Sequence, residues 1–172
     1  MIKAIETIYD NYHFRSRLEA RWAIFFNTLR VKYEYEKEGF DIDGLWYLPD
    51  FYLPDYSCWI EIKPDSFVLG SDEKINAFAK ATEDTFLLIC GIPKDERYIV
   101  NLKSGDLSEY CFFKSCRFVI PRKTTKPELC LLGSGGSWKN LINNPEQTDD
   151  EYESLFFRSL DEAYNSAMQA RF

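Results

Sequence analysis

The sequence lacks any apolar run approaching the roughly 20 residues that a helix needs to cross a bilayer. Its first eight residues also lack the hydrophobic region of a signal peptide. We therefore expect a cytoplasmic protein without a membrane partner. At the same time, 45% of the 172 residues are hydrophobic and 17% are aromatic, which excludes disorder throughout.

Histidine and paired cysteines are scarce. The chain has one histidine, His13, and five cysteines, none of them in a CxxC pair. An odd count without paired spacing argues against a disulfide framework. Cys111, Cys116 and Cys130 leave a zinc site open in principle, but the missing paired spacing and the distant histidine favour reduced, buried thiols.

Positive charge is also in short supply. The chain has 21 Lys and Arg against 28 Asp and Glu, so its net charge is −7. This balance argues against a protein that binds long nucleic acid through a positive net charge. It does not exclude a nuclease, because a local basic patch and a bound cation can dominate one face. The glycine-rich stretch at residues 133–139 lacks the GK[ST] ending of a P-loop. It therefore predicts a flexible loop and not a phosphate-binding loop.

What the chain does have is an aromatic stretch at residues 47–64, interrupted by the turn-forming residues 54–57. Tyr, Phe, Trp and Ile dominate it, which predicts two short strands joined by a turn. With a four-residue loop, Asp50 pairs with Glu61 on one face, with Cβ atoms roughly 5 Å apart. Lys63 follows on the same face.

Two like charges that face each other across a ladder are destabilising unless something compensates them. A divalent cation held by oxygen ligands would do so, with Lys63 as a second positive partner. The alternative is that Asp50 and Glu61 simply face solvent on an open sheet. Neighbouring aromatic residues, above all Trp59, argue against a plain solvated face.

A helix is predicted from Ser16, which can act as its N-cap, with Glu19 as the capping-box partner. One helical stripe is apolar: Leu18, Trp22, Phe25, Phe26 and Leu29. Glu19 lies at the edge of this stripe, where the helix would meet a sheet. Its carboxylate can therefore serve a site or only cap the helix, and the two roles exclude each other if it folds back onto Ser16.

Arg15, Arg17 and Arg21 surround the start of this helix. They are candidate phosphate contacts beside the carboxylates. The alternative is a solvated helix face with salt bridges. The helical angle of Arg15 is nearest the apolar stripe, so Arg15 is the best candidate of the three.

The remaining elements suggest one α/β core with an extension. Strands are expected at residues 2–8, 31–38, 85–91, 98–102 and 110–120, and turns at Gly39 and at residues 43–44. A helix begins near Ser71, and an acidic helix covers residues 149–172. A hairpin, a helix and a buried strand imply a crossover within one sheet. We predict a core at residues 1–122. Residues 123–172 would form a connector, a glycine-rich loop and a C-terminal helix that packs on the core.

The central motif has a counterpart in a known family. Pro49-Asp50, ten intervening residues and Glu61-Ile62-Lys63, preceded by a helical Glu19, resembles the signature of the PD-(D/E)XK nucleases. The resemblance is to small restriction-endonuclease-like proteins of phage and bacteria. It implies that the protein acts in the cytoplasm of a bacterial or phage-infected cell. It implies a mixed central sheet flanked by helices in the order αβββαβ.

The resemblance also implies chemistry. Asp50, Glu61 and the Ile62 carbonyl would hold Mg²⁺ or Mn²⁺, with Glu19 reaching the metal directly or through water. Lys63 would orient the attacking water or stabilise developing negative charge. The expected activity is phosphodiester hydrolysis. DNA is favoured over RNA as the substrate, and endonuclease activity is favoured over exonuclease activity.

A second reading keeps the nuclease fold without the catalysis. Such a module would bind nucleic acid or a protein, for example as an inhibitor or an assembly subunit. The apolar side of the C-terminal helix is the candidate surface for a protein partner or a homodimer. Divalent-cation binding separates the two readings.

Overall fold

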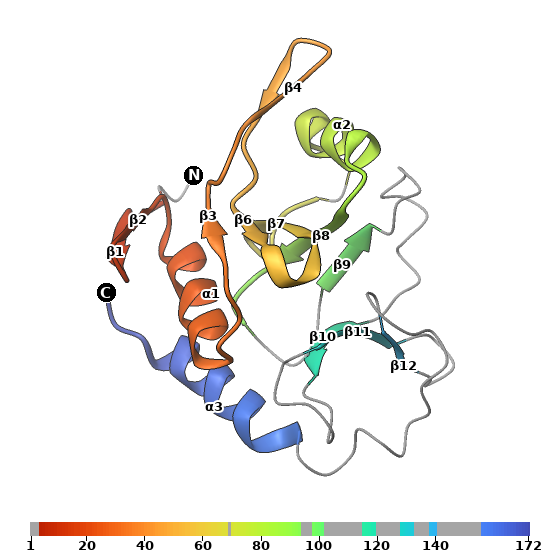
Figure 1. Ribbon diagram of the computed structural model, residues 1–172. Coiled ribbons are helices and arrows are strands. Elements are labelled where there is room, and N and C mark those ends of the chain that lie inside the picture. The colour runs from red at the N-terminus through yellow and green to blue at the C-terminus, as the bar shows by residue number, and fades with distance from the viewer. Residues whose placement is uncertain are drawn as a thin grey trace.

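The computed structural model in Figure 1 describes residues 4–68, 70–93, 98–101, 115–119, 128–132, 138–140 and 156–172. The basic connector at residues 121–127, residues 133–137 of the glycine-rich stretch and Cys111 lie outside them, as does the predicted boundary at residue 122. Among the described side chains, Cys58 and Cys90 are free thiols. No helix in the described part of the chain is long and apolar enough to cross a membrane.

A five-stranded mixed sheet forms the centre of the molecule (Figure 1). Its strands lie in this order: β3 (Glu34–Tyr35), β6 (Phe51–Leu53), β7 (Cys58–Lys63), β8 (Thr85–Cys90) and β9 (Tyr98–Asn101). β7 and β8 are parallel, and the other neighbours are antiparallel. The expected mixed α/β class is therefore confirmed, as is the crossover from β7 to β8.

The hairpin of β6 and β7 has the predicted register. Phe51 pairs with Ile60 and Leu53 pairs with Cys58. The connection is a short 3₁₀ helix, η1 (Pro54–Tyr56), followed by Ser57 in the left-handed region at φ 45°. The first strand is shorter than expected, because β6 begins only at Phe51.

Helix α1 (Arg17–Thr28) begins at the predicted N-cap, Ser16, and covers one face of the sheet. Its Trp22 ring is fully buried, and the indole N–H donates to the Gly91 carbonyl at 2.9 Å. Helix α3 (Phe156–Gln169) lies beside α1 (Figure 1) and buries Ala163 and Ala167 in the same core. Met168, expected on that apolar side, is exposed instead.

Helix α2 (Glu73–Ala81) covers the opposite face and follows its N-cap Asp72, close to the start expected near Ser71. A hairpin of β4 (Phe40–Ile42) and β5 (Leu45–Tyr47) completes this second core. Side chains alternate along β7, so Ile60 and Ile62 face α1 while Trp59 faces α2.

Several local expectations need correction. The strand expected over residues 31–38 shrinks to β3, because Glu36 adopts a left-handed φ of 47° that interrupts an extended chain. The β4–β5 hairpin occupies a region where only turns were expected, and Gly39 forms no turn there. The N-terminal segment is a hairpin of β1 (Thr7–Tyr9) and β2 (Tyr12–Phe14).

A separate three-stranded sheet follows the core. Its strands are β10 (Ser115–Val119), β11 (Glu128–Leu132) and β12 (Trp138–Asn140), in that order. Of these only β10 falls in a predicted strand. The predictions of strands at β8 and β9 are confirmed.

Candidate metal centre

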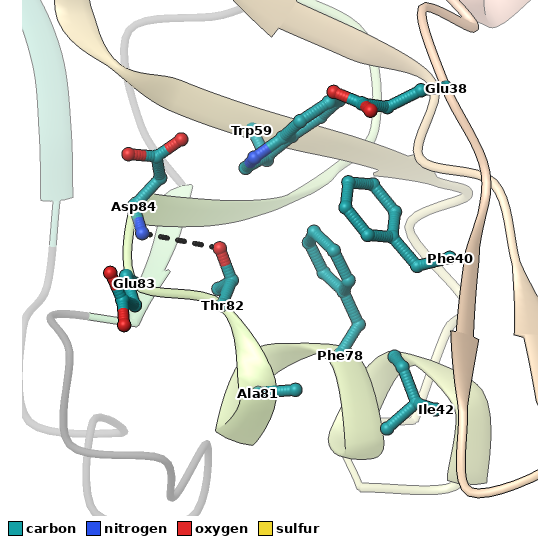
Figure 2. Close-up of a pocket in the computed structure, with 9 residues that line it drawn as sticks. All are labelled: Glu38, Phe40, Ile42, Trp59, Phe78, Ala81, Thr82, Glu83 and Asp84. Carbon is teal, nitrogen blue, oxygen red and sulfur yellow. Dashed lines mark hydrogen bonds between the residues drawn. The ribbon is translucent and has the colours of Figure 1, made fainter.

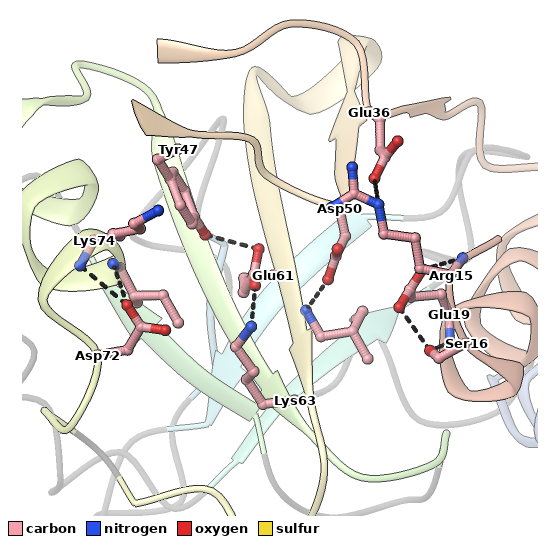
Figure 3. A network of polar contacts seen from close by, with 12 residues as sticks. Arg15, Ser16, Glu19, Glu36, Tyr47, Asp50, Glu61, Lys63, Asp72 and Lys74 are labelled. Carbon is pink, nitrogen blue, oxygen red and sulfur yellow. Dashed lines mark hydrogen bonds and ion pairs between the residues drawn. The ribbon is translucent and has the colours of Figure 1, made fainter. Parts of the chain in front are cut away.

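Asp50 lies opposite Glu61 when the hairpin register is continued by one residue from the pair of Phe51 and Ile60. The Asp50 carbonyl accepts from the Glu36 amide at 2.9 Å, so the main chain of Asp50 is turned toward β3. Asp50 and Glu61 therefore form a non-hydrogen-bonded pair, the kind in which opposed side chains are closer. Figure 3 shows Asp50 between Glu61 and Glu19.

The Asp50 carboxylate turns toward the backbone of β7, where Oδ2 accepts from the Ile62 amide at 2.7 Å. The Ile62 N–H thus points toward β6, and the carbonyl of the same residue points the same way. The residue opposite is Pro49, which has no N–H to offer that carbonyl. Asp50 Oδ1 also has no hydrogen-bond partner among the described residues. Two oxygens are therefore free to bind a cation.

Glu61 is held from two sides and is only 4% exposed. Lys63 Nζ lies 2.5 Å from Oε1, and the Tyr47 hydroxyl donates to Oε2 at 2.7 Å (Figure 3). Lys63 therefore sits beside its carboxylate, as expected. Asp50 and Glu61 point to different partners, Asp50 to the β7 backbone and Glu61 to Tyr47 and Lys63, yet the negative charge of Glu61 still raises the pKa of Asp50.

The pKa of Asp50 is raised well above its ordinary value, first by burial and then by the charges of Glu61 and Glu19. The Ile62 amide and Lys63 offset only part of this. Burial also raises the pKa of Glu61, against the opposing effects of Lys63 and Tyr47. Burial is the first cause of both shifts, and the neighbouring positive charge and hydrogen bonds do not offset it.

The neighbouring positive charge is that of Lys63. Its burial lowers its pKa, but the negative charges of Glu61, Asp50 and Asp72 outweigh burial, and the net pKa is raised. Lys63 is thus a stable ammonium ion. This state suits stabilising negative charge and does not suit accepting a proton from water.

Glu19 adopts the capping role. Its Oε1 accepts from the Ser16 hydroxyl at 2.6 Å, while its backbone amide donates to Ser16 Oγ at 3.2 Å. Oε2 accepts from the Tyr35 hydroxyl at 2.6 Å and from the Arg15 amide at 3.1 Å. With the carboxylate folded onto Ser16, Glu19 contributes negative charge near Asp50 rather than a free ligand.

The three arginines separate in space. Arg15 is near the carboxylates, where its Nε lies 2.6 Å from Glu36 Oε1 and its side chain is 64% exposed (Figure 3). Arg17 donates to the Phe172 carbonyl. Arg21 donates to three carbonyls at the end of α3, where helices leave carbonyls unpaired and favour cations. Of the three arginines, Arg15 alone lies beside the carboxylates.

Sequence patterns alone did not indicate the two tyrosines that donate to the glutamates. Tyr47 belongs to β5 and Tyr35 to β3, so neither is near its glutamate in sequence. By sequence, Tyr47 is only the first aromatic residue of the stretch at residues 47–64. The sole available signal was a tyrosine preceding the Pro49-Asp50 step, which is too common a feature to single out.

A cavity of about 330 Å³ lies at the other end of α2, away from the carboxylate pair (Figure 2). It is lined by the aromatic rings of Phe40, Trp59 and Phe78 and by Glu38, Glu83 and Asp84. No candidate site residue lines it. The pair itself lies under the opposite end of that helix, near Asp72.

The donor set fits a hard divalent cation only in part. Among the side chains that the structure describes, no group of three His, Cys, Asp or Glu comes together as a ready-made metal site. What converges is two carboxylates with raised pKa values and one carbonyl without a main-chain donor. Oxygen donors of this kind suit Mg²⁺ or Mn²⁺, with water completing the coordination. No family model matches the sequence, and no curated protein or solved structure proved similar to it.

Proposed function

We propose that this protein is a divalent-cation-dependent nuclease that hydrolyses phosphodiester bonds, with DNA favoured over RNA as the substrate. The observation that carries the proposal is the pairing of Asp50 with Glu61, whose pKa values are raised by burial and, at Asp50, by like charge. If only the five-stranded sheet and its flanking helices are counted, the order α1, β3, β6, β7, α2 and β8 supports the αβββαβ order that the resemblance implies, with the β4–β5 hairpin inserted outside that sheet.

Asp50, Glu61 and the Ile62 carbonyl would hold Mg²⁺ or Mn²⁺. Such a cation polarises the scissile phosphate and lowers the pKa of a bound water. Lys63, kept protonated, stabilises negative charge on the phosphate. Glu19 anchors the start of α1 next to the pair, and Arg15 is the nearest cation for a flanking phosphate.

The test is cleavage of labelled linear and circular DNA and RNA with Mn²⁺, Mg²⁺ or EDTA. Asp50→Asn, Glu61→Gln and Lys63→Met should each lower the rate by about a hundredfold or more. The matched control is Asp43→Asn, at an exposed turn position with φ 51°, which asparagine tolerates. Cutting of the circle identifies an endonuclease. Undiminished cleavage by the Asp50→Asn protein would end this proposal.

One observation keeps the non-catalytic reading as a second candidate. Arg17 and Arg21 donate to carbonyls at the C-terminal end of the chain, so of the three candidate phosphate contacts only Arg15 lies beside the pair. A nuclease-fold module without catalysis would remain folded and bind no Mg²⁺ or Mn²⁺ in calorimetric titrations. Cation binding together with cleavage favours the nuclease.

A further inference from the structure

Tyr47 makes a contact with Glu61 that the nuclease motif does not contain. Its hydroxyl donates to Glu61 Oε2 at 2.7 Å, and both side chains are buried. Lys63 occupies the other oxygen, Oε1. One oxygen of the carboxylate therefore pairs with the Lys63 ammonium group, and the other accepts a hydrogen bond from the neutral Tyr47 hydroxyl.

The position of Tyr47 is set by the second core. Its ring packs against Phe78 of α2 with 4.9 Å between centroids. Phe40, on the partner strand β4, packs against Phe78 at 5.0 Å and Trp59 at 5.1 Å. The β4–β5 hairpin is thus held against α2 and β7, and the hydroxyl has a fixed place.

The neutrality of this donor matters. A second ammonium group at the position of the Tyr47 hydroxyl would cancel the charge that a cation needs. Without a donor to Oε2, the Glu61 carboxylate would be free to turn both oxygens toward Lys63. A phenol prevents that rotation and leaves the negative charge in place.

We propose that Tyr47 is a positioning residue that holds the Glu61 carboxylate in the orientation in which it binds the divalent cation with Asp50. This inference rests on the proposed cation-dependent function. It assigns the β4–β5 hairpin a role as an outer support of the metal centre, the kind of support that orients a ligand through a hydrogen bond.

The test compares Tyr47→Phe with Tyr56→Phe. Both remove one hydroxyl from a buried tyrosine, but Tyr56 lies in the turn at the far end of the β6–β7 hairpin. Calorimetric titration of the full-length protein with Mn²⁺ should show affinity about tenfold to a hundredfold weaker for Tyr47→Phe and unchanged for Tyr56→Phe. Cleavage lost by Tyr47→Phe at low Mn²⁺ should return at high Mn²⁺, with KM for DNA unchanged.

The outcomes are distinguishable. If the wild-type protein binds Mn²⁺ and both variants bind it equally well, the positioning role is overturned and the proposed function stands. If the wild-type protein binds no divalent cation, the proposed function fails and this inference fails with it. Should Tyr47→Phe not fold, NMR of the wild-type protein decides. The Tyr47 hydroxyl proton, identified by its NOEs to the Phe78 ring, should shift on addition of Mg²⁺, and an unmoved resonance refutes the role.

Discussion

Asp50→Asn is expected to stabilise the protein in the absence of divalent cations. Two unit charges roughly 5 Å apart, at an effective dielectric constant of about 20, repel by roughly 3 kcal/mol. Asparagine keeps an oxygen that accepts from the Ile62 amide, and losing the charge on that hydrogen bond costs about 1 kcal/mol. Attraction to Lys63 is lost too. The net gain in the free energy of unfolding is about 1–2 kcal/mol.

Saturating cation should invert this order. Mg²⁺ or Mn²⁺ at a hundred times its Kd stabilises the wild-type protein by about 2.7 kcal/mol and should do little for Asp50→Asn. The variant is thus the more stable protein in EDTA and the less stable one with cation.

Thermal melts in the two buffers measure both effects, because each kcal/mol moves Tm by roughly 2–4 °C in a chain of this size. Asp43→Asn, in the exposed β4–β5 turn, should match the wild-type protein in both buffers. Lower stability of Asp50→Asn in EDTA would refute the argument that the facing carboxylates repel each other without compensation.

Three further predictions follow from the same contacts. The facing carboxylates have raised pKa values in the folded state. The stability they contribute is therefore complete below their ordinary pKa near 4 and is lost as the pH rises toward the folded values. Urea titrations of the cation-free protein should show this fall in the free energy of unfolding, and added Mg²⁺ should oppose it. Arg15→Gln should weaken DNA binding and reduce the slope of log affinity against log salt concentration by about 1. Arg21→Gln should leave DNA binding intact and lower the free energy of unfolding by about 1 kcal/mol, because α3 loses a cation at its C-terminus. Equal effects of the two variants on DNA binding would contradict this difference in roles. Trp22→Phe leaves the buried Gly91 carbonyl without its donor and should cost about 1–3 kcal/mol in urea unfolding, and an unchanged midpoint would mean that water replaces the indole.

Local rules account for the elements that could be predicted. The β6–β7 register follows from a four-residue turn and from the two-residue period of strands, so Asp50 and Glu61 could be paired before any coordinates. Ser16 was recognisable as an N-cap because capping depends on residues within one turn. The continuous apolar run of β8 marked a strand buried on both faces.

Tertiary structure decided which partners those residues received. Tyr47 reaches Glu61 only because the β4–β5 hairpin packs on α2, and Arg21 binds α3 from more than a hundred residues away in sequence. Glu19 could cap or serve the site by sequence, and the Tyr35 hydroxyl together with Ser16 settled it as a cap. Spacing along the chain predicts which faces residues share, but hydrogen-bond partners depend on where distant segments pack.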